Sequence, residues 1–220
     1  MNKPLVLASA AILAASVAQA SPTASGRGAQ AVKPFAATAG TLYNNTGTDS
    51  GLGIVSQNFE SSFDIYDSQI ADDFKVPKFR KWNITEIDIT GVYFNGSGPA
   101  QSEHVTIYKD ASGKPGAVAA DYSELTGLDN GSGSFTITLP KTTLKSGTYW
   151  LSVFANMDFS LGGEWAWENF LETVRNPAQW QNPGDGFGTG CTTWGQENVC
   201  VPDGQGDNFF VLKGKSRLAP

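Results

Sequence analysis

The sequence predicts an all-β protein, a single antiparallel β-sandwich of the jelly-roll type. Only 16% of the residues are charged, and the chain contains 25 glycines and 11 prolines, a balance that favours short strands and turns over long solvated helices. Several short segments alternate apolar and polar residues, as half-buried strands do. Turn signals such as Asn95-Gly96 and Ser146-Gly147 separate these segments.

Six segments carry the strand pattern. They cover residues 70–77, 82–94, 104–109, 135–139, 149–155 and 207–213. Pro77 is expected to end the first of them, because proline cannot donate to a strand ladder. Residues 164–175 fit both a strand and a helix, so their structure stays open.

The order of these segments predicts one folded domain behind an export signal. Lys3, the apolar run 5–17 and Ala18-Gln19-Ala20 match a signal peptide over residues 1–20. We expect a flexible leader at 21–41, the β-sandwich at 42–214 and a polar tail at 215–220. The protein is therefore expected to be secreted and extracellular, with the periplasm as the alternative location.

The charge balance limits the classes of binding partner that we expect. The net charge is −6, and removal of Lys3 with the signal peptide leaves 14 cations against 21 acids, or −7. We find no basic run in the sequence, and we expect no nucleic-acid or membrane partner and a monomer. In an oxidising compartment Cys191 and Cys200 are expected to form a disulfide, which would contribute about 2.7 kcal/mol by closing a ten-residue loop.

Local motifs assign no catalytic residue. The only histidine is His104, and neither a G-x-S-x-G turn nor a zinc ligand set accompanies it. The neighbours Asp72 and Asp73 point to opposite faces of a strand, so they cannot act together on one sugar. Glu164 and Glu168 share a face but lie roughly 13 Å apart in a strand, too far for a glycosidase pair. In a helix they would be close neighbours.

Asp72 lies on a face that is otherwise apolar. Ile70, Phe74 and Val76 share this face, and a carboxylate buried among them needs hydrogen bonds or a cation. Two outcomes stay open: a network to backbone amides, and a calcium site with help from acidic turns. Calcium is the only cofactor that the sequence suggests.

The most distinctive composition lies between residues 162 and 200, which hold four of the six tryptophans. Trp165 and Trp167 share a face in a strand, and flat aromatic side chains bordered by polar groups suit sugar rings. The alternative is that these indoles fill the core. The expected ligand-binding residues are Trp165, Trp167, Trp180, Trp194, Glu164, Asn169, Gln181 and Asp185.

Four segments together resemble a group of secreted bacterial β-sandwich modules. They are Ile70-Ala-Asp-Asp-Phe-Lys-Val-Pro77, Ile87-Asp-Ile-Thr-Gly-Val-Tyr-Phe94, Gly147-Thr-Tyr-Trp-Leu-Ser152 and Trp180-Gln-Asn-Pro-Gly184 with the glycine-rich run that follows. The similarity spans about residues 42–214. It implies an exported jelly-roll protein, and it supplies no activity and no catalytic residue.

These observations lead to three hypotheses for function. The first is a secreted, non-catalytic module that binds a glycan or another cell-surface polymer through an aromatic surface. The second is a structural or adhesive extracellular protein without a small ligand. The third is a secreted glycoside hydrolase that uses two carboxylates from distant strands.

Overall fold

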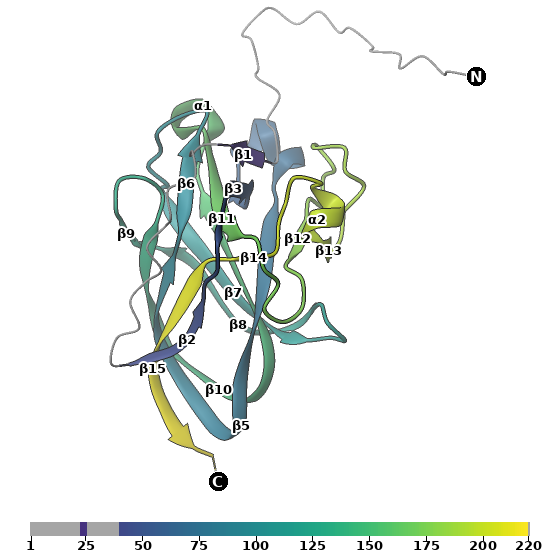
Figure 1. The fold of residues 1–220 in the computed structure, drawn as a ribbon. Coiled ribbons are helices and arrows are strands. Elements are labelled where there is room, and N and C mark those ends of the chain that lie inside the picture. The colour runs from purple at the N-terminus through teal and green to yellow at the C-terminus, as the bar shows by residue number, and fades with distance from the viewer. Residues whose placement is uncertain (1–22, 26–39, 220) are drawn as a thin grey trace, which may run out of the picture.

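The computed structural model describes residues 23–25 and 40–219 and shows two antiparallel sheets packed against each other (Figure 1). The predicted all-β sandwich is therefore confirmed. Helical structure in these residues is limited to short turns. These are the 3-10 turn η1 (Ser61–Tyr66), α1 (Phe159–Gly162) and α2 (Glu197–Cys200). Among the described residues, no helix is long and apolar enough to cross a membrane.

The smaller sheet has five strands. In order they are β1 (Thr23–Ser25), β3 (Asp49–Val55), β11 (Glu164–Phe170) and β14 (Asp207–Asn208), and β6 (Gly91–Phe94) pairs with β11. The segment 164–170, for which helix and strand were both open, is thus a strand. Both faces of β11 are buried, which explains why its sequence lacks a clean alternation.

The larger sheet has ten strands. Its main path is β13 (Gly195–Gln196), β12 (Gln179–Gln181), β5 (Gln69–Ile89), β10 (Phe135–Asn156), β7 (Ser102–Asp110) and β8 (Pro115–Leu125). Four further strands attach to it: β2 (Thr41–Asn45), β4 (Gln57–Asn58), β9 (Leu128–Asp129) and β15 (Phe210–Leu218). Among the described strands, only β4 pairs in parallel, with β10.

The strands β5 and β10 are the central pair of the fold, because they stay paired over 14 residue positions. The predicted end of a strand at Pro77 is wrong. Val76 faces Gly147 and Lys81 faces Lys145, so residues 77–80 bulge out opposite Ser146 and the ladder then resumes. A bulge accommodates a proline that a regular ladder would reject, so β5 covers the predicted segment 70–77 and continues through residues 82–89 of the next. The predicted segment 82–94 is divided, because residues 91–94 form β6 in the smaller sheet.

The strand β15 corrects another expected boundary. Residues 215–218, expected to be a polar tail, continue β15 and pair with β5 as far as Arg80. The predicted signal peptide and most of the leader lie outside the described residues. Residues 215–218 form part of the sheet and are not a free extension of it.

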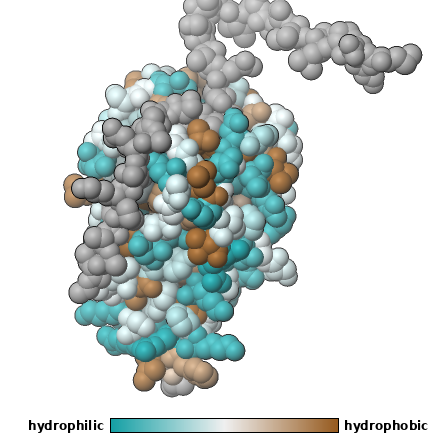
Figure 2. Space-filling model, viewed as in Figure 1, coloured by the Kyte–Doolittle hydropathy of each residue, from teal (hydrophilic) through white to brown (hydrophobic). Residues whose placement is uncertain are grey.

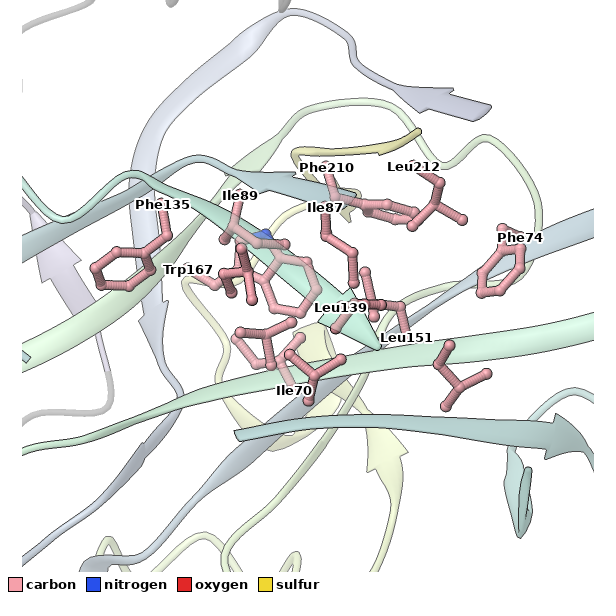
Figure 3. Packing of buried hydrophobic residues seen from close by; sticks show 14 of the residues in the cluster. Ile70, Phe74, Ile87, Ile89, Phe135, Leu139, Leu151, Trp167, Phe210 and Leu212 are labelled. Atoms are coloured by element: carbon pink, nitrogen blue, oxygen red, sulfur yellow. The ribbon is translucent and has the colours of Figure 1, made fainter. Parts of the chain in front are cut away.

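The core lies between the two sheets and is continuous. Figure 3 shows Phe74, Ile87 and Leu151 of the larger sheet in one cluster with Trp167 of the smaller sheet. These side chains are completely removed from solvent. The predicted alternation is confirmed along β10, where Phe135, Ile137 and Leu139 are all buried.

The expected disulfide is present. The sulfur atoms of Cys191 and Cys200 lie 2.09 Å apart and the two Cα atoms 5.8 Å apart. The bridge joins α2 to the loop that follows β12. It therefore closes the loop-rich side of the sandwich, where β12 and β13 form only a short ladder.

Candidate functional site: a basic face at one end of the sandwich

Three of the four tryptophans expected on the surface lie in the core. Trp165, Trp167 and Trp180 are fully buried. Each indole N–H donates to a backbone carbonyl: to Gly133 at 2.7 Å, to Phe209 at 2.9 Å and to Val55 at 3.0 Å, respectively. Trp165 and Trp167 do share a face, as predicted, but the core covers it. The expected aromatic surface therefore does not form from these residues.

The fourth tryptophan stands alone. Trp194 is partly exposed and packs edge to face on Tyr108, with 5.7 Å between the ring centroids. Two of the polar residues expected beside the tryptophans form hydrogen bonds with other residues. Gln181 donates to Gln69 at 3.0 Å, and Asp185 accepts from the amide of Gly190 at 2.8 Å. The structure does not bring these residues together into one platform.

The other two expected polar contacts are buried. Glu164 accepts from Asn95 at 2.6 Å, and burial raises its pKa to about 7. Asn169 donates to Glu197 at 3.1 Å. Because Glu164 and Glu168 are both buried in a strand, they line no open groove, and a glycosidase pair at these positions is not supported.

Of the two outcomes left open for Asp72, the structure shows the first, a buried carboxylate held by hydrogen bonds that include backbone amides. Its Oδ1 accepts from the amide of Asp73 at 2.7 Å, and its Oδ2 accepts from Asn45 at 2.9 Å and from the amide of Asn208 at 2.7 Å. Complete burial and the nearby charge of Asp207 raise the pKa of Asp72 well above its usual range. The carboxyl group joins β2, β5 and β14. No group of three His, Cys, Asp or Glu suited to a metal occurs in the described part of the chain, so calcium ligation gains no support.

His104 is a surface residue. Its Nε2 lies 2.8 Å from Asp121, which also accepts from Thr106 at 2.6 Å, and its ring stacks on Phe154. Among the described residues, no serine or cysteine forms a hydrogen bond with this pair. The imidazole and Thr106 instead lower the pKa of Asp121, although slight burial acts in the opposite direction.

The charges of the domain are strongly segregated. Residues 40–219 contain 12 Lys and Arg and all 21 Asp and Glu. Nine of these 12 cations lie in three short segments, 75–81, 141–145 and 213–217, which contain no acid. The three segments belong to β5, β10 and β15, which run together to the end of the molecule where the chain ends (Figure 1).

Strand register places these cations side by side. Lys81 is directly opposite Lys145 on one side and Arg217 on the other, so three positive side chains form a row on one face. In the next row, Lys215 lies opposite Asn83, which accepts from Thr143 at 2.8 Å. We call this outward surface, made by Lys81, Lys141, Lys145, Lys213, Lys215 and Arg217, the basic face. The opposite face of the same strands carries the buried residues Trp82, Ile84 and Leu144.

A groove of about 490 Å³ runs along the basic face. Its walls carry four cations and one acid, Glu86. The lining residues are Gly40, Asn83, Thr85, Glu86, Lys141, Lys213, Gly214, Lys215 and Arg217. The groove therefore offers positive charge together with amide and hydroxyl groups, a combination suited to an anionic, hydroxyl-rich ligand.

Only one cation of the basic face is neutralised. Lys213 lies 2.6 Å from Glu86 and 2.6 Å from Asp88. Partial burial acts to lower the pKa of Lys213, but these two carboxylates outweigh it and raise the pKa above its usual value. Within the described residues, Lys213 is the one member of the basic face with a carboxylate at ion-pair distance. The other five keep their positive charges available to a ligand.

The basic face corrects the interpretation that the sequence has no basic run. A signal was present in the sequence, since Lys-Val-Pro-Lys-Phe-Arg-Lys holds four cations in residues 75–81 and residues 213–217 hold three in five. The net charge of −6 concealed both runs. Their meeting on one surface depends on the register of β5 and β15, which the sequence does not reveal.

A smaller hollow of about 210 Å³ lies elsewhere on the molecule and carries two carboxylates. Asp64 and Asp67 both line it, together with Asn58, Gln69 and other residues. Burial raises the pKa of Asp67 to about 6, with an added contribution from the charge of Asp64. Two carboxylates thus face one hollow, but both come from the single turn at η1 and not from the distant strands that the third hypothesis invokes.

Comparison with known proteins adds no assignment. No protein-family model, no curated protein and no solved structure matches this chain.

Proposed function

We propose that this protein is an extracellular, non-catalytic binding module for an anionic surface polymer, held on the basic face. The observation that carries the proposal is the charge segregation: nine of the 12 described cations occupy three acid-free segments at one end of an acidic domain. The aromatic surface that the sequence suggested is replaced by an electrostatic one. The polymer remains a glycan, now one that bears carboxylate or sulfate groups.

The arrangement of the cations argues for a ligand. Like charges placed directly opposite each other on neighbouring strands destabilise a sheet. Lys81, Lys145 and Arg217 occupy such a row, although Lys213 shows that the sequence can place a carboxylate beside a lysine on this face. A bound polyanion would remove the repulsion that the free protein retains.

The shape of the site argues for a chain rather than a single small anion. Cations extend along β15 at alternate positions, Lys213, Lys215 and Arg217, which spaces them about 6.6 Å apart. The groove follows the same line and includes side chains from β5 and β10. A polymer with regularly repeated charges can contact several of these cations at once, and multiple contacts raise its affinity.

The first experiment measures binding of the purified protein to carboxylated and sulfated polysaccharides and to neutral dextran, over a range of salt concentrations. Polygalacturonate, alginate and dextran sulfate serve as the anionic probes. We expect saturable binding to at least one anionic polymer, none to dextran, and an affinity that falls as salt rises. The double variant Lys215→Ala/Arg217→Ala should bind at least about tenfold more weakly.

The matched control removes two exposed cations outside the basic face. Lys109→Ala/Lys114→Ala changes the net charge by the same amount and should bind as the parent does. Equal losses in both double variants, or no binding to any anionic polymer, would contradict the proposal. Preferential binding to duplex DNA would replace the glycan with a nucleic acid. Release of new reducing ends from a polymer would favour the hydrolase hypothesis and direct attention to Asp64 and Asp67.

A further inference from the structure

Two large apolar side chains are exposed at the end of the molecule that carries the basic face. Phe79 is 77% exposed and Leu218 is 71% exposed. The two positions are adjacent, because Leu218 pairs with Arg80 and the amide of Ala219 donates to the carbonyl of Phe79 at 2.9 Å. Figure 2 shows hydrophobic atoms gathered at this end, below a band of hydrophilic ones. We call Phe79 and Leu218 the apolar tip.

The exposed Phe79 has an energetically unfavourable backbone conformation. Phe79 has a φ of 61°, in the left-handed region that bulky residues rarely adopt. It lies at the centre of the bulge 77–80, so the conformation belongs to the turn that brings β5 round the end of the sandwich. An aromatic side chain kept exposed by a strained backbone suggests a functional role rather than a packing one.

Cations surround the apolar tip. Lys78 and Arg80 flank Phe79 in sequence and are exposed, and Arg217 precedes Leu218. Lys81 and Lys145 lie in the adjoining row of the basic face. An apolar projection flanked by positive charge has the chemistry that peripheral proteins use at membranes containing anionic lipids.

We infer that the apolar tip inserts into the interfacial region of an anionic lipid bilayer while the surrounding cations contact the lipid headgroups. The occupant is a bilayer and not a protein groove, because the apolar surface is small, lies at the end of an elongated domain and has only cations among its charged neighbours in sequence and register. The inference goes beyond the proposed polymer binding, and it departs from the expectation that the protein has no membrane partner.

The test uses protein exported by an expression host, purified after its N-terminus has been determined, so that an uncleaved apolar leader does not confuse the result. Partition is measured by sedimentation with phosphatidylcholine vesicles, with and without phosphatidylglycerol. We expect partition only with the anionic lipid, weakened by salt, and reduced roughly tenfold by Phe79→Ser. Phe79→Trp should gain fluorescence that is quenched by lipids with brominated acyl chains.

The matched control is Leu161→Ser. Leu161 is 80% exposed on α1, at the other end of the molecule, and should be dispensable for partition. Equal partition of Phe79→Ser and Leu161→Ser, at unchanged unfolding midpoints, would overturn the inference. The inference would also be overturned if the parent protein bound vesicles of phosphatidylcholine alone as well as it binds vesicles that contain phosphatidylglycerol.

The same variants separate this inference from the proposed function. Phe79→Ser should leave polysaccharide binding intact, whereas Lys215→Ala/Arg217→Ala should weaken both activities. If no polymer binds but partition still depends on Phe79, the inference stands and the proposed function fails. If Phe79→Ser weakens polymer binding and vesicle binding equally, the tip belongs to the polymer site and the membrane assignment is wrong.

Discussion

At the scale of single residues, the tryptophans show what strand periodicity can and cannot predict. A period of two correctly placed Trp165 and Trp167 on one face. It does not tell which face the second sheet covers, and both residues proved to be buried. A tryptophan in a core needs a partner for its N–H, and here each partner is a carbonyl contributed by a distant segment. Such partners cannot be identified from local sequence.

Truncation of a buried indole should therefore affect stability and not ligand contact. Trp167→Ala should lower the free energy of unfolding by about 3–5 kcal/mol, because it leaves a cavity and removes the indole donor of the Phe209 carbonyl, which keeps only the longer bond of 3.4 Å from the amide of Thr90. Urea unfolding followed by circular dichroism measures the change. Trp194→Ala, at a partly exposed position, should cost much less. Equal stability of parent and Trp167→Ala would contradict the buried placement.

At the scale of elements, buried polar side chains join α2, β11 and β14. Glu197 of α2 accepts from Asn169 of β11, and its second oxygen is buried without a hydrogen-bond partner. Burial raises the pKa of Glu197 to about 8, and the charge of Asp207 adds to the effect. These contacts cross between distant segments. No sequence pattern indicates a role for Glu197, since an isolated glutamate in a loop-rich region is normally exposed.

The raised pKa of Glu197 predicts how stability depends on pH. The folded state holds this proton more tightly than the unfolded state, whose carboxyl has a pKa near 4.5. Stability should therefore fall as pH rises from about 4.5 to about 8. Glu197→Gln keeps the shape without the ionisation, so the decline should become shallower. Thermal unfolding midpoints across this range test it.

The control for this pH effect is Glu124→Gln, which changes an exposed carboxyl on β8. It should leave the pH profile as in the parent. If Glu197→Gln showed the same slope as the parent protein, other buried carboxyls would account for the decline. Asp207 and Glu164, with pKa values raised to about 6 and about 7, would then be the next positions to change.

Element boundaries were harder to predict than element identity. The alternation within 82–94, 135–139 and 149–155 identified strands correctly, because a half-buried strand has a clear period. The proline at position 77 and the charged residues after Lys213 were interpreted as ends. A bulge and an exposed strand face tolerate both, and neither is visible until the partner strand is known.

At the scale of the whole molecule, net charge proved a poor guide to the surface. A value of −6 predicts that the protein avoids anionic materials, but the structure gathers nine cations at one end. The fold class followed from composition and periodicity, which are local properties. The candidate site did not, because it depends on the register by which Lys81, Lys145 and Arg217 become neighbours.

Chromatography offers a direct test of this segregation. Despite its negative net charge, the protein should be retained at pH 7 and low salt on a cation-exchange resin, which is itself negatively charged. Lys215→Ala/Arg217→Ala should elute at lower salt than the parent. Lys109→Ala/Lys114→Ala should elute close to it. Passage of the parent protein through the column without retention would show that the basic face is too weak to act alone.

The separation of charge along the long axis of the domain also aligns its dipole moment with that axis. The basic end of β5, β10 and β15 lies opposite the end that carries α1, so the domain has a large dipole moment in addition to its net charge. Near an anionic surface the field turns such a molecule before it touches, within about 10 Å at 0.1 M salt. The domain would thus arrive already oriented, and more of its collisions would be productive than for a uniformly charged protein of the same size.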